Sequence, residues 1–146
     1  MKDIARHALA VMALITAALG QQQGDSLSAS IEKAQALDKE ALRVCHAVPV
    51  DINWQFSVDQ ARRAEQWEMK PADVLMSIQT DVMFVRGAIV VDLADCAHLQ
   101  EPSGQKMTLK LQAAIWDLDH AEQQLLQKRL LNTLLMDEIQ AKQKEH

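Results

Sequence analysis

Hydrophobic residues recur every three or four positions along most of this chain, the spacing that places them on one face of a helix. The first stripe predicts a helix from about Ser28 to Ala47, which Pro49 ends. A second helix is expected to open at "SVDQ", where Ser57 and Gln60 have capping-box spacing, and to end near Lys70. The connector between the two helices is expected to pack its two aromatic side chains back into the core.

The stripe that follows Pro71 has two interpretations. Apolar residues at helical spacing from Leu75 to Cys96 predict a third helix, with Pro71 in its first turn, where proline is favoured. The segment "VMFVRGAIVV", residues 82–91, would also suit a short β-hairpin, since it is rich in β-branched residues around a glycine. We favour the helix, because the segment lacks strict alternation and an isolated two-stranded ribbon is marginal.

A longer helix is expected after the break at "EPSG", residues 101–104. Residues 105–144 contain no proline or glycine, and forty residues make a helix of roughly 60 Å. The third helix, at about 28 residues, is too short to cover that length, so part of the rod should project or meet another chain. The pattern therefore predicts an all-α bundle of about four helices with one long C-terminal helix.

Leucine spacing in the final helix is also typical of a coiled coil. Seven of nine heptad core positions are apolar in the series Leu111, Ala114, Leu118, Ala121, Leu125, Lys128, Asn132, Leu135 and Ile139. Asn132 stands where a buried amide can fix the register of paired helices. Leu126, Leu130 and Leu134 form a second row on another face. Either one row packs within the chain while the other receives a partner, or both rows are ordinary bundle core.

Composition narrows the class of protein. The chain of 146 residues has 49% apolar and 24% charged side chains, which suits one globular domain. Four glycines, three prolines and an aromatic content of 3% favour long helices over a β-sandwich. A formal net charge of −5, without a cluster of lysine and arginine, argues against a nucleic-acid partner.

The first twenty residues have the three parts of a secretory signal. Lys2 and Arg6 form a short basic region, residues 8–19 are uncharged, and Ala18-Leu19-Gly20 offers small residues to a signal peptidase. Twelve residues span roughly 18 Å as a helix, against about 30 Å of hydrocarbon core; a retained membrane anchor and a buried helix are the alternatives. We expect a cleaved signal at 1–20, a single domain at 21–146, and a periplasmic or secreted protein.

Two cysteines that each have a histidine nearby raise the question of a metal site. Cys45 and His46 are adjacent, and one residue separates Cys96 from His98. Structural zinc sites space their ligand pairs by two to four residues, so this spacing argues against a metal. No C-x-x-C motif is present, and no cofactor is expected. In an oxidising compartment a disulfide between Cys45 and Cys96 is predicted, with buried free thiols as the alternative in the cytosol.

Motifs for catalysis are few. The sequence has no Gly-x-Ser-x-Gly elbow, phosphate loop or His-Glu-x-x-His motif. Arg62 and Arg63 could bind an anionic substrate in a helical cavity, with His98 as a further lining residue. A small periplasmic enzyme or ligand-binding protein is therefore the main alternative function. The carboxylates of Asp92 and Asp95 are expected on a solvated face.

These observations lead to one functional hypothesis. The chain is expected to act as an exported interaction protein, such as an assembly factor, a secretion-apparatus component or a small chaperone. It would bind a protein partner, or a second copy of itself, through the residues Leu126, Leu130, Asn132 and Leu134. Contact with a membrane is expected only if the N-terminal segment is retained as an anchor.

Overall fold

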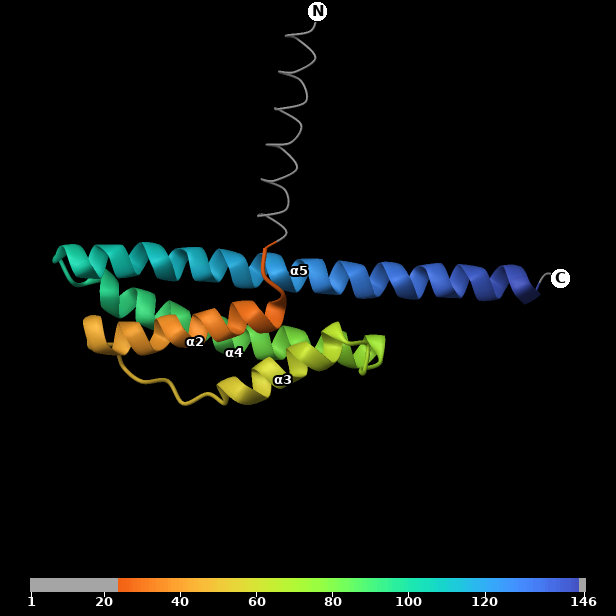
Figure 1. Ribbon diagram of the computed structural model, residues 1–146, viewed down its shortest axis with the longest axis horizontal. Coiled ribbons are helices and arrows are strands. Elements are labelled where there is room, and N and C mark those ends of the chain that lie inside the picture. The colour runs from red at the N-terminus through yellow and green to blue at the C-terminus, as the bar shows by residue number, and fades with distance from the viewer. Residues whose placement is uncertain (1–23, 145–146) are drawn as a thin grey trace, which may run out of the picture.

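The computed structural model describes residues 24–144, and these form an all-α bundle (Figure 1). Its helices are α2 (Leu27–Val44), α3 (Trp54–Glu65), α4 (Pro71–Ala97) and α5 (Pro102–Lys144). Between residues 24 and 144 there is no strand, and residues 82–91, the segment of the alternative hairpin, lie inside α4. The expected signal segment, residues 1–20, lies outside the described residues.

The helices form three layers. α2 and α4 run side by side in the same direction, α3 packs against both on one side, and α5 packs against both on the other (Figure 1). α3 and α5 run opposite to this central pair. Because α2 and α4 are parallel, their C-terminal ends lie at the same end of the bundle.

The start of α2 is capped by a side chain of its own and by one from α3. Ser26 accepts a hydrogen bond from the backbone N–H three residues later, at 3.3 Å. The Glu65 carboxylate accepts from the backbone N–H and the hydroxyl of Ser28, both at 2.9 Å, and its charge complements the helix dipole. α2 ends at Val44, earlier than predicted, because His46 takes a left-handed φ of 51°.

α3 begins earlier than the capping-box spacing predicted. Asn53 caps it in place of Ser57 and accepts the backbone N–H of Phe56 at 3.0 Å. Phe56 therefore lies in the first turn and is 52% exposed, so the expectation that it packs into the core is wrong. Trp54 does pack against the core. The helix ends at Glu65, before the predicted end.

The connection between α4 and α5 is tight. Residues 98–101 form it, and α5 begins at Pro102, inside the segment predicted to be a break. The carbonyl of Glu101 accepts the backbone N–H of Gly104 at 3.0 Å, which starts the helix. Gly104 is buried, and a Cβ atom added to it would lie 2.6 Å from the Cβ of Leu99. The glycine therefore permits the two helix ends to approach closely.

The core lies along the inward faces of α2, α4 and α5. Its largest fully buried apolar side chains are those of Leu27, Ile31, Ile78, Ile89, Met107, Leu111 and Leu118. The heptad series predicted in α5 joins this core only at its first five positions, from Leu111 to Leu125. Lys128, Leu135 and Ile139, farther along the series, are exposed. α5 thus packs within the bundle for only part of its length.

The remainder of α5 extends past the other helices. Its 43 residues make a rod of about 65 Å, whereas the 27 residues of α4 make about 40 Å. The C-terminal part of α5 projects beyond the ends of α3 and α4 (Figure 1). We call residues 130–144, which follow the last buried residue of α5, Arg129, the overhang. The sequence predicted such a projection from helix length alone.

Candidate functional site

Cys45 and Cys96 form a disulfide that joins the C-terminal ends of α2 and α4. Their Sγ atoms are 2.09 Å apart and their Cα atoms 5.0 Å apart, which is the pairing that the sequence predicted. His46 and His98 are both exposed near this bond. Within residues 24–144, no group of three or more His, Cys, Asp or Glu side chains is placed to hold a metal ion. The two cysteines therefore connect helices and offer no free thiol for catalysis.

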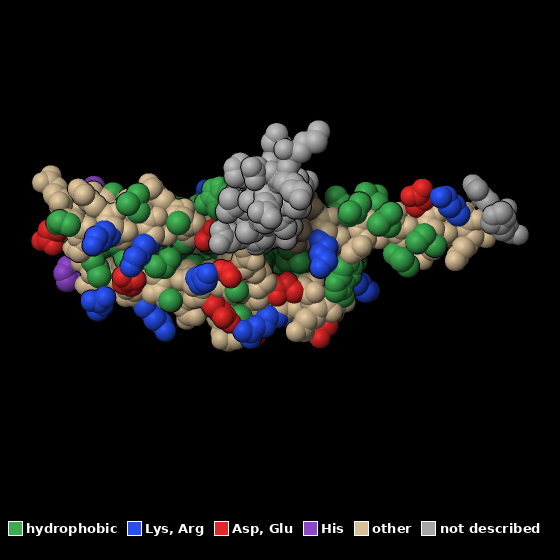
Figure 2. All heavy atoms as spheres, turned by 45° about the horizontal axis from the view of Figure 1, so that its top comes forward, with side chains coloured by type: hydrophobic (Ala, Val, Ile, Leu, Met, Phe, Trp, Pro, Cys, Tyr) green, Lys and Arg blue, Asp and Glu red, His purple; other side chains and the backbone are tan. Residues whose placement is uncertain are grey.

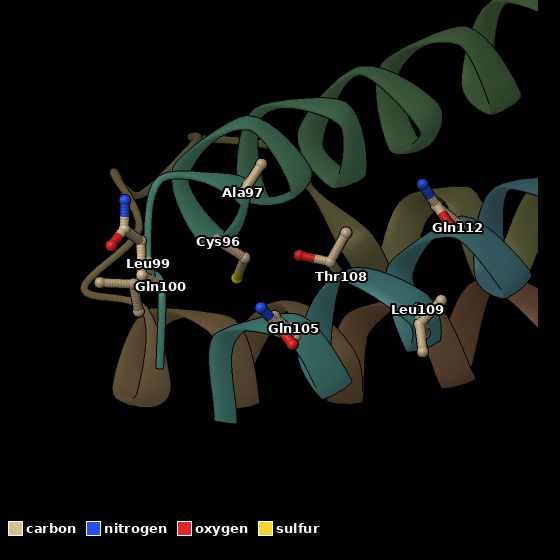
Figure 3. A pocket seen from close by; sticks show the side chains of 8 residues that line it. All are labelled: Cys96, Ala97, Leu99, Gln100, Gln105, Thr108, Leu109 and Gln112. Carbon is tan, nitrogen blue, oxygen red and sulfur yellow. The ribbon is translucent and has the colours of Figure 1, made fainter. Parts of the chain in front are cut away.

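A hollow of about 450 Å³ opens beside the disulfide, where the end of α4 meets the start of α5 (Figure 3). Gln100, Gln105, Gln112 and Thr108 supply the polar part of its lining, and none of its lining side chains is charged. The Thr108 hydroxyl already donates to the carbonyl of Gly104 at 2.9 Å. A neutral, amide-lined hollow of this kind supplies no nucleophile and no acid–base group.

The residues of the alternative enzyme interpretation do not meet in one cavity. Arg62 and Arg63 lie exposed on α3, and Arg62 is ion-paired with Glu32 in the second turn of α2. His98 lies at the other end of the bundle, beside the disulfide between Cys45, which directly follows α2, and Cys96. The part of α2 between Glu32 and Cys45 is about 20 Å long. These three side chains therefore do not form a shared anion site.

Three aspartates lie buried between the helices. Asp38 of α2 is 7% exposed, and Asp81 and Asp92 of α4 are 8% and 0% exposed. The expectation that Asp92 lies on a solvated face is therefore wrong. Its carboxyl group lies close to that of Asp38 across the α2–α4 interface, and both of its oxygens are buried without a hydrogen-bond partner in the described chain. Asp95, one turn later, accepts the backbone N–H of Val48 at 2.9 Å and so fixes the connector that follows the disulfide.

Burial controls the protonation of these carboxyl groups. Removal from water raises the pKa of Asp92 to about 8, and the nearby carboxyl groups of Asp38 and Asp95 act in the same direction. Burial also raises the pKa of Asp81 to about 6. At neutral pH Asp92 is therefore mainly in its neutral, protonated form. Because Asp92 has no contact with solvent, no substrate reaches this pair, and we assign it a role in packing.

A buried arginine marks the point where the bundle ends. Arg129 of α5 is 5% exposed, and its guanidinium carbon lies 4.0 Å from the centre of the Trp67 ring. It also donates a hydrogen bond to the carbonyl of Met69. Trp67, in the connector between α3 and α4, takes a left-handed φ of 64°. Arg129 thus fastens this connector to α5, one residue before the overhang begins.

The overhang presents large apolar side chains to solvent. Six of them are 47–62% exposed: Leu130, Leu131, Leu134, Leu135, Met136 and Ile139. Figure 2 shows hydrophobic side chains along this part of α5, with charged side chains towards its tip. A contiguous exposed apolar surface of this kind is typical of an interaction site.

The predicted partner-binding residues occupy two settings. Leu130 and Leu134 are 62% and 57% exposed, whereas Leu126 and Asn132 are half-buried. A groove of about 240 Å³ lies at the root of the overhang, between the start of α4 and α5. Leu126 and Leu130 line this groove together with Leu75 of α4. The groove and the exposed leucine row therefore form one continuous apolar surface.

Two buried polar residues, Asp92 and Arg129, were missed from the sequence. Their spacing from neighbouring apolar residues could have indicated that they are buried, although their residue types could not. Asp92 stands between Ile89 and Cys96 at three- and four-residue spacing, in the same stripe that predicted the core face of α4. Arg129 follows Leu125 by four residues, in the row of α5 that faces the bundle. Charged residues are seldom buried, so neither residue was expected in the core despite this spacing.

Comparisons of this chain with protein-family models, with curated proteins and with solved structures gave no match. Its candidate site is therefore argued from its own residues. Among the features described above, the overhang and the groove at its root form an exposed apolar surface.

Proposed function

We propose that this protein is an exported helical interaction protein that binds a partner protein through the overhang of α5. The observation that carries the proposal is the apolar surface of residues 130–144, whose large side chains are 47–62% exposed. Burying such surface against a partner is favourable by about 25 cal/mol for each Å² of apolar area. In the described part of the chain, no helix packs over these side chains.

The arrangement supports a helix-in-groove mode of binding. Leu130 and Leu134 lie one turn apart on the same side of α5, and such a pair can enter an apolar groove of a partner. A side chain of the partner would in turn fill the groove beside Leu75 and Leu126. Asn132, half-buried at the edge of this surface, offers an amide that can set the register of the complex.

Charge contributes little to this surface. The overhang contains two acidic and two basic residues, and Glu138 pairs with Lys142 on the overhang itself. Its formal charge is therefore balanced, so we expect the affinity for the partner to change little with ionic strength. Strong weakening by added salt would instead indicate a charged interface elsewhere on the molecule.

Export is the second part of the proposal. The disulfide is compatible with an oxidising compartment, and residues 1–20 have the composition of a secretory signal. Intact-mass analysis of natively expressed protein, alkylated with and without reductant, tests both points. We expect a mass without residues 1–20 and alkylation only after reduction. A retained N-terminus together with two alkylated thiols would contradict export.

Photo-crosslinking in the native host tests the binding surface. A photoreactive amino acid at position 130 or 134 of the full-length chain is expected to capture the same protein from both positions. Position 109 serves as a matched control, since Leu109 is an exposed leucine of the same helix, about 30 Å from Leu130. Equal capture from position 109 would show that the contact is non-specific.

A charge substitution then tests whether the captured protein binds through the leucine row. Leu130→Glu is expected to abolish co-purification of the captured partner, because it places a charge in the apolar surface. Leu109→Glu is expected to retain the partner. The two leucines are 62% and 67% exposed, so they differ mainly in location. Circular dichroism of both variants checks that the helical content is unchanged. Loss of the partner with both variants, or with neither, would contradict the proposed site.

A further inference from the structure

The outward face of α4 carries a second apolar surface, separate from the overhang. Six exposed positions follow one another at alternating spacings of four and three residues: Met76, Thr80, Met83, Gly87, Val90 and Ala94. This alternation keeps a row on one side of a helix along its whole length. The row covers about 27 Å from end to end. We call it the α4 stripe.

The α4 stripe offers almost no polar group to solvent. Met76 and Met83 are 73% and 61% exposed, and Phe84 and Val91, beside the stripe, are 55% and 37% exposed. The hydroxyl of Thr80 donates to the carbonyl of Met76 at 2.8 Å, so it is satisfied within the helix. No charged residue belongs to the row. An uncharged apolar face of this length is typical of a contact surface.

Gly87, in the middle of the stripe, is not required for any close contact within the described residues. Glycine in the interior of a helix is less stable than alanine, so it usually marks a close approach. Gly104 shows such an approach, since an added Cβ would meet Leu99 at 2.6 Å. A Cβ added to Gly87 would meet nothing within 4 Å. The space that this glycine leaves open can be filled only from outside the described chain.

The sizes of the side chains in the stripe are self-complementary. In an antiparallel pairing of two α4 helices, centred at residue 85, Met83 faces Gly87 and Met76 faces Ala94. The remaining pair, Thr80 with Val90, consists of two β-branched side chains of similar size. Every large side chain therefore meets a small one. A parallel pairing would set Met83 against Met83 and leave a gap at Gly87.

We propose that α4 pairs with α4 of a second copy of this chain, in antiparallel orientation, to form a two-fold dimer. Each contact in such an interface occurs twice, as two-fold symmetry requires. The overhang lies on α5 and is not part of the α4 stripe, so the dimer would present two overhangs to partners.

A lipid surface is the competing occupant of this face. α4 is long and apolar enough to cross a membrane by length and composition, although part of it is buried in the bundle. Helices that bind membrane surfaces usually carry several lysines or arginines. Arg86 is the one basic residue of α4, and its side chain is ion-paired with Asp119 at 3.2 Å. The charge of α4 therefore favours a second copy over an anionic lipid surface.

Sedimentation velocity of the full-length chain over a range of concentrations tests the dimer. We expect a reversible monomer–dimer equilibrium, and Met83→Glu is expected to raise the dissociation constant at least about tenfold, because two charges would be buried per dimer. Leu109→Glu, the matched change away from the stripe, is expected to leave it unchanged. A monomer at every concentration, or a dimer insensitive to Met83→Glu, would overturn the proposal.

Gly87→Ala separates this interface from any effect on folding. The added methyl group meets open space in the single chain, so monomer stability is expected to rise. In the dimer the same methyl group meets Met83 of the other copy, so the dissociation constant is expected to increase several-fold. A variant that is more stable and dimerises equally well or better would contradict the close approach at Gly87.

The orientation of the dimer is tested by mixing chains that carry Met83→Cys with chains that carry Gly87→Cys, followed by mild oxidation. We expect the mixed bond between positions 83 and 87 to dominate. Homodimeric bonds at position 83 would overturn the antiparallel arrangement. Flotation with phosphatidylcholine–phosphatidylglycerol vesicles tests the lipid alternative. If the chain is a monomer that binds these vesicles, and Met83→Glu abolishes the binding, the stripe contacts lipid and the dimer proposal is overturned.

Discussion

The carboxyl group of Asp92 links the packing of this bundle to pH. It is fully buried in the α2–α4 interface, close to the carboxyl group of Asp38. A charged carboxylate at this place would be both removed from water and repelled by its neighbour. The interface is therefore more stable with Asp92 in its protonated form than with Asp92 ionised.

Stability is expected to decrease as the pH rises. The pKa of Asp92 is about 8 in the folded chain and about 4 in an unfolded one. The folded chain binds this proton more tightly, so its contribution to stability is complete below about pH 4 and is lost as the pH rises through about 8. Urea unfolding between pH 5 and pH 9 measures the decrease. Asp92→Asn is expected to reduce the slope, because an amide remains neutral throughout this pH range.

An exposed aspartate provides the control for this measurement. Asp137→Asn, on the overhang, is expected to give the same slope as the unmodified chain. Some decrease should remain in Asp92→Asn, since the raised pKa of Asp81, about 6, acts in the same direction. Identical slopes for Asp92→Asn and the unmodified chain would show that Asp92 is already ionised when buried.

At the scale of the helices, two glycines have opposite surroundings. Gly104 lies at the α4–α5 corner against Leu99, whereas Gly87 faces open space. Gly104→Ala is expected to lower the free energy of unfolding by about 1–3 kcal/mol, because the helix ends must move apart. Gly87→Ala is expected to raise it by up to about 1 kcal/mol. Urea unfolding at low protein concentration measures both values, and changes of the same sign would contradict these surroundings.

Helices were predicted more reliably than their ends. The spacing of apolar residues shows which positions face a core, and it correctly favoured a helix over a hairpin at residues 82–91. Ends depend on single residues that the spacing does not reveal. Asn53 and Ser57 are both suitable caps, and the structure uses Asn53. His46 and Trp67 take left-handed conformations just after α2 and α3, a choice that their residue types do not indicate.

For the whole molecule, the disulfide is expected to be a major source of stability. The bond between Cys45 and Cys96 spans 51 positions of the sequence, and the chain-entropy model assigns such a loop about 4 kcal/mol. Reduction with dithiothreitol is therefore expected to lower the free energy of unfolding by up to this amount, as measured in urea. A double variant, Cys45→Ala with Cys96→Ala, is expected to show no response to the reductant. No change on reduction of the unmodified chain would contradict this role.

The candidate surface could be predicted only in part. Comparing helix lengths was enough to indicate that α5 projects, and the leucine spacing placed Leu126, Leu130 and Leu134 in a row apart from the heptad series. Of these, Leu130 and Leu134 are exposed. The groove at the root of the overhang could not be predicted, because Leu75 and Leu126 come together only when α4 packs on α5. The outward side of α4 could not be predicted either, because the packing of α2, α3 and α5 decides which of its sides remains open.

The position of Arg129 has a consequence for how the overhang meets a partner. A separate peptide of the length of residues 130–144 would be a marginal helix in water, because its first turn must form without help. Here the preceding turns are already wound and held by Arg129 against Met69 and Trp67. Extending an existing helix avoids that unfavourable nucleation step. An approaching protein therefore meets a rod whose backbone is already ordered, and little conformational freedom remains to be lost on association.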